Sequence, residues 1–136
     1  MTTVLIVDPN KDTRLALEAQ LSESNQFERV CSCSSLNAVR PMLQQHGVKV
    51  MLVDADQVGD STLLLSIKDE NPELGVVLVQ GHAGVIDSAT LQELGAHAQT
   101  SRMAAPMEIV ASVAKALVAR LKPSKRILSK FLKDHK

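Results

Sequence analysis

The chain has 136 residues, 45% hydrophobic and 22% charged, a composition typical of one soluble globular domain. It has two phenylalanines and no tryptophan or tyrosine, so the core must be aliphatic and aromatic platforms for nucleic-acid bases are missing. The net charge is zero, but nine basic and fourteen acidic residues precede Lys122, and six basic residues and one acidic residue occur from there on. The N-terminus has no signal-like stretch and no apolar run reaches membrane-spanning length, so we expect a cytoplasmic protein with Cys31 and Cys33 reduced.

Strand-like and helix-like patterns alternate along the chain. The first apolar run, Val4–Val7, ends at Asp8, and an amphipathic helix is expected from about Lys11 to Ser24. We assign the apolar stripe of this helix to the following residues: Leu15, Ala16, Ala19, Leu17 and Leu21. Further strands are expected at about Phe27–Cys33, Val48–Val53, Gly75–Val79 and Ala96–Ser101.

Helix start and stop signals separate these strands. Ser34 or Ser35 can cap a helix that ends at Gly47, and Pro41 predicts a kink or a late start within it. Asp60 or Ser61 opens a helix to about Glu70, and another runs from about Ile86 to Leu94. The last helix, Met107–Leu121, follows Pro106, and its apolar side is assigned to Ile109, Val110, Val113, Leu117 and Leu121.

Five alternating strand and helix units predict an α/β fold with a doubly wound parallel sheet. The runs at Val4–Val7, Val50–Val53 and Val76–Val79 are apolar throughout, as expected for central strands covered on both faces. The second and fifth strands are mixed and should lie at the edges. These constraints favour the flavodoxin-like strand order 2-1-3-4-5.

Two acidic residues stand at the carboxyl ends of two expected central strands. Asp8 follows the first and Asp54 follows the third, the edge where ligands bind in open α/β sheets. Neighbouring carboxylates repel each other unless a proton or a cation lies between them, and hard oxygen ligands suit Mg²⁺. With a metal bound, a carboxylate oxygen could attack a phosphoryl group. The alternative is that both aspartates only cap loops and the helices that follow.

The apolar run ending in Asp8, the run Val50–Val53 ending in Asp54, and Gly95-Ala96 resemble the landmarks of the response-regulator receiver domain, in the same order over about residues 2 to 121. The resemblance implies that Asp54 accepts a phosphoryl group from a histidine kinase or a phosphotransfer protein. It also implies a Mg²⁺ site formed by Asp8, Asp54 and the backbone carbonyl of Asp56. The chain would then be a signalling protein and not an enzyme.

Five positions depart from the family pattern. The second acidic residue of the metal-binding pair is Pro9, so Mg²⁺ binding should be weak, although the Asp56 carboxylate could substitute in part. Gln80 replaces the hydroxyl residue after the fourth strand, and Arg102 replaces the lysine after the fifth. Both are expected to contact phosphoryl oxygens. Met103 stands where the family has a proline, and Gln99 replaces the switching aromatic residue, so any phosphorylation signal must be transmitted differently.

Two other functions remain open. A phosphorylation-independent pseudo-receiver would keep the fold as a protein–protein interaction module. The run from Asp54 to Val58 also resembles the nucleophile motif of haloacid-dehalogenase-type phosphatases, but those enzymes carry it on their first strand and need a later lysine and acidic pair.

We divide the chain into a receiver-like domain, residues 1–122, and a basic amphipathic tail, residues 123–136. The tail could be a helical extension that contacts a partner, anionic lipid or nucleic acid, or a linker to an effector domain. The domain itself is not expected to bind nucleic acid directly. The expected partners are the phosphodonor protein, a downstream target or fused effector, and a second copy in a homodimer.

Overall fold

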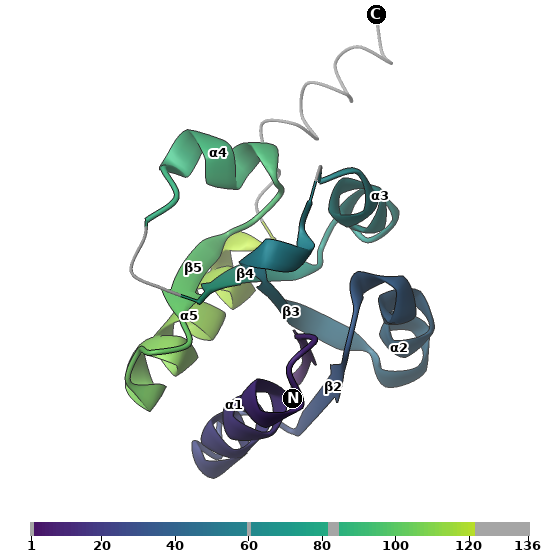
Figure 1. The fold of residues 1–136 in the computed structure, drawn as a ribbon. Helices are drawn as coiled ribbons and strands as arrows, with labels where there is room; N and C mark the ends of the chain where they lie inside the picture. Colours follow the sequence, from purple (N-terminus) through teal and green to yellow (C-terminus); the bar gives the residue numbers. More distant parts are fainter. Residues whose placement is uncertain (1, 60, 82–84, 122–136) are drawn as a thin grey trace, which may run out of the picture.

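A computed structural model of the chain describes residues 2–59, 61–81 and 85–121 (Figure 1). The tail, residues 123–136, and Asp60, one of the two expected helix starts, lie outside the described residues. Within the described part, no helix has the length and apolar character needed to cross a membrane.

One parallel sheet of five strands forms the centre of the molecule, in the order β2-β1-β3-β4-β5. This confirms the predicted flavodoxin-like order, with the two mixed strands at the edges. Every residue of β1 is buried, as are Val50–Val53 of β3 and Gly75–Val79 of β4, because helices cover both faces of these central strands. The strands are β1 (Thr3–Val7), β2 (Arg29–Cys33), β3 (Val48–Asp54), β4 (Gly75–Gln80) and β5 (Ala98–Ser101).

Helices pack on the two faces of the sheet in separate layers (Figure 1). Helices α1 (Lys11–Glu23) and α5 (Pro106–Ala119) cover one face. The other face is covered by α2 (Val39–His46), α3 (Thr62–Glu70) and α4 (Ser88–Glu93). Two short 3₁₀ helices, η1 (Leu36–Ala38) and η2 (Ala55–Gln57), precede α2 and α3. This arrangement keeps the carboxyl ends of β1 and β3 at one edge of the sheet, between the layers.

The helix boundaries follow the local signals in the sequence. The Asn10 side chain accepts a hydrogen bond from the backbone N–H of Thr13 at the start of α1. Pro41 lies in the first turn of α2, which begins late after η1, where a proline breaks no helical hydrogen bond. Gly47 ends α2 with a φ of 60°, a left-handed conformation that glycine adopts without strain.

Two of the predicted apolar stripes are confirmed only in part. In α1 the buried residues are Leu17 and Leu21, whereas Leu15 is 52% exposed. In α5 the face on the sheet is formed by Ile109, Val110, Val113 and Ala116, whereas Leu121 is 62% exposed. The spacing therefore identified the packed face of α5 except at Leu121, whereas in α1 it included exposed residues beside the two that are buried.

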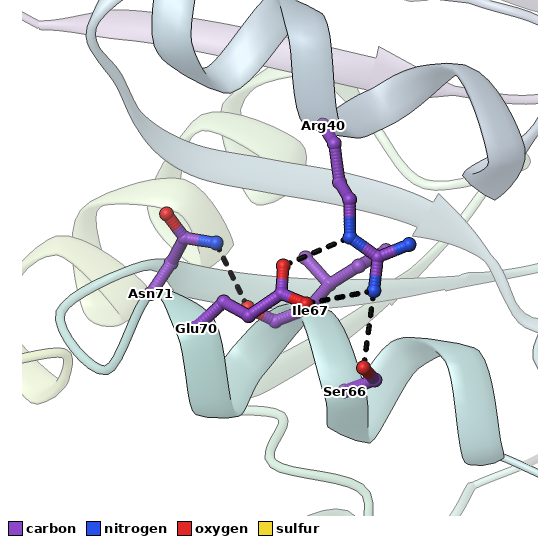
Figure 2. Close-up of polar contacts among 5 residues, drawn as sticks. All are labelled: Arg40, Ser66, Ile67, Glu70 and Asn71. Carbon is purple, nitrogen blue, oxygen red and sulfur yellow. Dashed lines mark hydrogen bonds and ion pairs between the residues drawn. The ribbon is translucent and has the colours of Figure 1, made fainter.

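Helices α2 and α3 are also joined by polar contacts at the surface (Figure 2). The Nε of Arg40 donates to Glu70 Oε2 at 2.8 Å, and its Nη2 donates to Glu70 Oε1 and to Ser66 Oγ, both at 3.0 Å. The hydrogen bond with Arg40 lowers the pKa of Glu70. At the end of α3, the Asn71 amide donates to the carbonyl of Ile67 at 2.9 Å. The contacts of Arg40 link α2 and α3 at the surface, and the Asn71 hydrogen bond closes the end of α3.

Two basic side chains lie at the opposite end of β4 from its carboxyl edge. Lys68 is 3% exposed, and its ammonium group donates to the carbonyls of Pro72 and Leu74. Burial lowers the pKa of Lys68 to about 8. The Nδ1 of His97 accepts a hydrogen bond from the backbone N–H of Val76 at 3.1 Å. Burial, with the charge of Lys68, lowers the pKa of His97 to about 4.

We expect the free energy of unfolding to decrease as the pH falls from 6.5 towards 4. In this window the unfolded chain binds a proton at His97 and the folded chain does not, so stability rises with pH. Because the ring is half-buried, the decrease should be about 1–2 kcal/mol. Urea unfolding across this pH range will measure it. His97→Asn keeps an acceptor for Val76 without titrating, and an unchanged pH dependence in that variant would contradict the assignment.

Candidate functional site

The candidate site lies at the carboxyl ends of β1 and β3. Val7 and Val53 are paired in register, so Asp8 and Asp54 follow at equivalent places on neighbouring strands. Both side chains are buried, with exposed fractions of 1% and 4%. The structure therefore brings together the two carboxylates that the sequence analysis expected at this edge of the sheet.

Local hydrogen bonds hold Asp8 in place. Its Oδ1 accepts from the backbone N–H of Asn10 at 2.8 Å, and its backbone carbonyl accepts from Nη1 of Arg14 at 2.8 Å. Its backbone N–H donates to the carbonyl of Cys33 on β2 at 3.1 Å. The second carboxylate oxygen, Oδ2, is buried and has no hydrogen-bond partner among the described residues. Asp8 is thus rigidly oriented, with one oxygen available to a ligand.

Asp54 is paired with a cation from the loop after β5. The Nη2 of Arg102 lies 3.5 Å from Asp54 Oδ1, an ion pair without hydrogen-bond geometry, since both Asp54 Oδ1 and Arg102 Nε lack partners. Burial raises the pKa of Asp54, and the charge of Asp8 raises it further. Arg102 and a hydrogen bond with the Asp56 backbone lower that pKa without cancelling the rise.

The Arg102 guanidinium packs against the backbone after β4. A Cβ atom added at Gly81 would lie 2.6 Å from Arg102 Nη2 and 3.2 Å from Cζ, so only a residue without a side chain leaves room for the guanidinium in this position. The backbone N–H of Arg102 donates to the carbonyl of Gln80 at 2.9 Å. Arg102 therefore reaches Asp54 across the end of β4.

Gln80 is directed towards β5. Its Nε2 donates to Gln99 Oε1 at 2.7 Å. The same Gln99 oxygen accepts from the backbone N–H of Ile86 at 2.9 Å, and Gln99 Nε2 donates to the Ile86 carbonyl at 2.7 Å. We call these three residues the amide cluster. The sequence analysis identified Gln80 and Gln99 separately and missed their contact, although two glutamines on adjacent parallel strands, β4 and β5, are a signal that could have indicated it. A contact between Gln80 and a phosphoryl group stays a prediction.

The carboxylates do not form a three-residue metal cluster. Asp56 follows in η2 and is exposed, and among the described residues no group of three histidine, cysteine or acidic side chains is arranged to hold a metal ion. Cys31 and Cys33 are free thiols. The two unpartnered oxygens of Asp8 and Asp54 fit a cation, but Arg102 already supplies a positive charge at Asp54. The donor set therefore suits at most weak Mg²⁺ binding.

Comparisons with known proteins identify the fold. No family model and no curated protein matches the chain, but solved structures do. NtrX from Brucella abortus, in complex with ADP, is 20% identical with a TM-score of 0.75, over 99% of this chain and 29% of NtrX. The N-terminal signal receiver domain of a Bacteroides fragilis response regulator is 24% identical with a TM-score of 0.74, over 86% of this chain and 97% of that domain.

The lysine decarboxylase LdcF from Francisella novicida is 14% identical with a TM-score of 0.64, over 88% of this chain and 17% of that enzyme. The chain thus has the flavodoxin-like α/β fold, and more specifically the fold of response-regulator receiver domains. It spans 29% of the length of NtrX. Because this fold also matches part of an enzyme, a function for this chain must be argued from its own site.

Proposed function

We propose that the chain is a cytoplasmic signalling receiver in which Asp54 accepts a phosphoryl group. The observation that supports this is the pair of buried carboxylates with unpartnered oxygens, Asp8 Oδ2 and Asp54 Oδ1. A buried polar oxygen without a partner lowers stability, and a charged one lowers it further. A site that binds a cation or a phosphoryl group accounts for two such oxygens at one edge of the sheet.

In the proposed transfer, a carboxylate oxygen of Asp54 attacks the phosphorus of a phosphohistidine on a histidine kinase or phosphotransfer protein. The P–N bond breaks, its electron pair stays on the imidazole, and that ring takes up a proton. The guanidinium of Arg102, near Asp54 Oδ1, can rotate to pair with the phosphoryl oxygens. Mg²⁺ held by Asp8, Asp54 and the Asp56 carbonyl would offset charge on the transferred group.

We expect intact mass spectrometry to detect one added phosphoryl group when the protein is incubated with a small acyl phosphate and Mg²⁺. Asp54→Asn should abolish the shift because the nucleophilic oxygen is lost. Asp12→Asn, at an exposed aspartate of α1, should retain it and serves as the matched control. A shift that persists in Asp54→Asn would contradict the proposal, as would the absence of a shift with both the small donor and a cognate kinase.

The second candidate is a phosphorylation-independent interaction module. This candidate is favoured because the two side chains expected to contact the phosphoryl group already have other partners. Arg102 pairs with Asp54 itself, and the Gln80 amide donates to Gln99. Such a module would bind its target equally well after Asp54→Asn. In either case the target would be a downstream protein or a fused effector domain.

A further inference from the structure

A groove lies between α1 and α5, at the surface of the helix layer that covers one face of the sheet. It has a volume of about 490 Å³, within the range of about 300–1,000 Å³ found for ligand-binding pockets. Its α5 side includes Met107, Ala111 and Ala114, and its α1 side includes Gln20 and Glu23. The groove is therefore large enough to take several side chains of another segment.

The two walls of this groove differ in chemistry. The α5 wall is apolar and uncovered, since Met107 is 84% exposed and Ala111 and Ala114 are exposed too, whereas Ile109 of the same helix is buried on the sheet. The α1 wall is polar, and Glu23 is the one charged side chain among the described residues that line the groove. An exposed apolar wall facing an acidic one fits a segment that is apolar on one side and basic on its flanks.

We propose that the basic tail of the same chain, residues 123–136, docks in the groove between α1 and α5. The apolar residues of the tail have the spacing of one helix face: Ile127, Leu128, Phe131 and Leu132. Basic residues surround them in the sequence: Lys125, Arg126, Lys130, Lys133 and Lys136. Nine basic and fourteen acidic residues precede Lys122, so the rest of the chain attracts a tail of opposite net charge.

The sequence between α5 and the tail favours a reversal of the chain. Helix α5 ends at Ala119, and Nη1 of Arg120 donates to the carbonyl of Glu73 at 3.2 Å, which holds the end of the helix against the loop before β4. Pro123 has no N–H and disfavours a helical conformation at the residue before it. Ser124 can then cap a new helix. Two helices joined by a loop of two to five residues form an antiparallel hairpin.

The length of the tail matches the groove in such a hairpin. Counted back along α5 from Leu121, Ala114 lies about 10 Å away and Met107 about 21 Å away. A helix from residue 125 to residue 136 is about 18 Å long, so it extends along the α5 wall. A short linker gives an effective concentration on the order of millimolar. A contact with a dissociation constant of about 0.1 mM between separate molecules would therefore be mostly formed within one chain.

A fluorescent reporter in the full chain tests the proposal. The protein has no tryptophan or tyrosine, so Phe131→Trp adds a single reporter on the apolar face of the tail. Its emission should be blue-shifted relative to free tryptophan, because docking removes the indole ring from water. Ala114→Glu places a charge in the apolar wall, so it should shift the emission to longer wavelength and increase acrylamide quenching about threefold or more. Ala89→Glu, at an exposed alanine of α4, should change neither.

The acidic wall and the tail are tested with further variants. In the reporter chain, Glu23→Lys should shift the emission in the same direction as Ala114→Glu does, by a smaller amount, whereas Glu93→Lys at an exposed position of α4 should not. In the chain without the reporter, Leu128→Ser should shift the NMR amide resonances of Ala111 and Ala114 and leave those of α4 unchanged. Thermal unfolding of each variant verifies that it is folded.

A reporter that emits like free tryptophan in the full chain would overturn the proposal. A blue-shifted reporter that Ala114→Glu leaves unchanged would also overturn it, because the tail would then dock elsewhere. A blue shift that grows with protein concentration would assign the groove to the tail of another copy and overturn docking within one chain. A blue shift that is independent of concentration and is lost with Ala114→Glu is the result that supports the proposal.

Discussion

Replacing Gln99 by leucine is expected to lower the free energy of unfolding by about 2–3 kcal/mol. The side-chain amide of Gln99 satisfies both backbone polar groups of Ile86 and also accepts from Gln80. Leucine keeps the approximate volume and removes all three hydrogen bonds, which leaves the N–H and the carbonyl of Ile86 without these partners. Urea unfolding of the purified variant measures the loss.

The matched control is Gln92→Leu, the same substitution at an exposed position of α4, where we expect a change within about 0.5 kcal/mol. A double-mutant cycle with Gln80→Ala and Gln99→Leu isolates the contact between the two amides, with an expected coupling of about 1 kcal/mol. Additive effects of the two substitutions would contradict the amide cluster as a coupled unit. Equal stabilities of Gln99→Leu and Gln92→Leu would contradict its structural role.

The amide cluster also bears on the proposed signalling function. Gln80 is the last residue of β4, next to Val79, which pairs with Asp54. Because Ile86 precedes α4, the cluster connects the edge of the candidate site with the segment leading into α4. A rearrangement at Asp54 that withdrew Gln80 would remove one of the hydrogen bonds on Gln99. In this chain, amide hydrogen bonds therefore occupy the place where the resembled family relies on a hydroxyl and an aromatic ring.

The strand order and the two carboxylates could be predicted because each depends on local pattern and general topology. Uniformly apolar runs indicate central strands, and the carboxyl ends of neighbouring parallel strands must meet at one edge. Those rules placed Asp8 beside Asp54. The side chains of Arg102 and Gln80 were not predictable in the same way, because each has a long side chain and its direction depends on neighbours such as Gly81 and Gln99.

The faces of the helices were predicted in part. In α5, the predicted residues from Ile109 to Leu117 lie in or against the core, whereas Leu121 continues the same repeat and is exposed. Periodicity identified the packed face but not where its contact with the sheet ends. In α1, Leu17 and Leu21 are buried as predicted, whereas Leu15 is exposed.

Replacing Arg102 by methionine is expected to destabilise the protein at neutral pH by about 2 kcal/mol. Arg102 is the cation nearest the buried Asp54 carboxylate, and its charge lowers a pKa that burial and Asp8 have already raised. Without it, a negative charge stays buried beside Asp8 with less compensation. Urea unfolding at pH 7 measures the loss, and Arg29→Met, at an exposed arginine of β2, is the matched control.

The loss in Arg102→Met should depend on pH and on Asp54. A folded-state pKa above the unfolded value means that stability falls as the pH rises through the folded pKa, and removing Arg102 moves that pKa higher. The deficit should therefore shrink as the pH falls, because the raised pKa lets Asp54 take up a proton more readily in the folded state, and it should be larger at neutral pH than in acid. In an Asp54→Asn background, Arg102→Met should lower the free energy of unfolding by less than about 0.5 kcal/mol. A deficit that is independent of pH and persists in the Asp54→Asn background would show that Arg102 acts through packing and not through its charge.

Gly81→Ala, which displaces the guanidinium, should also raise the Asp54 pKa, by a smaller amount than Arg102→Met does. ¹³C NMR of the carboxyl carbon of Asp54 can measure this change.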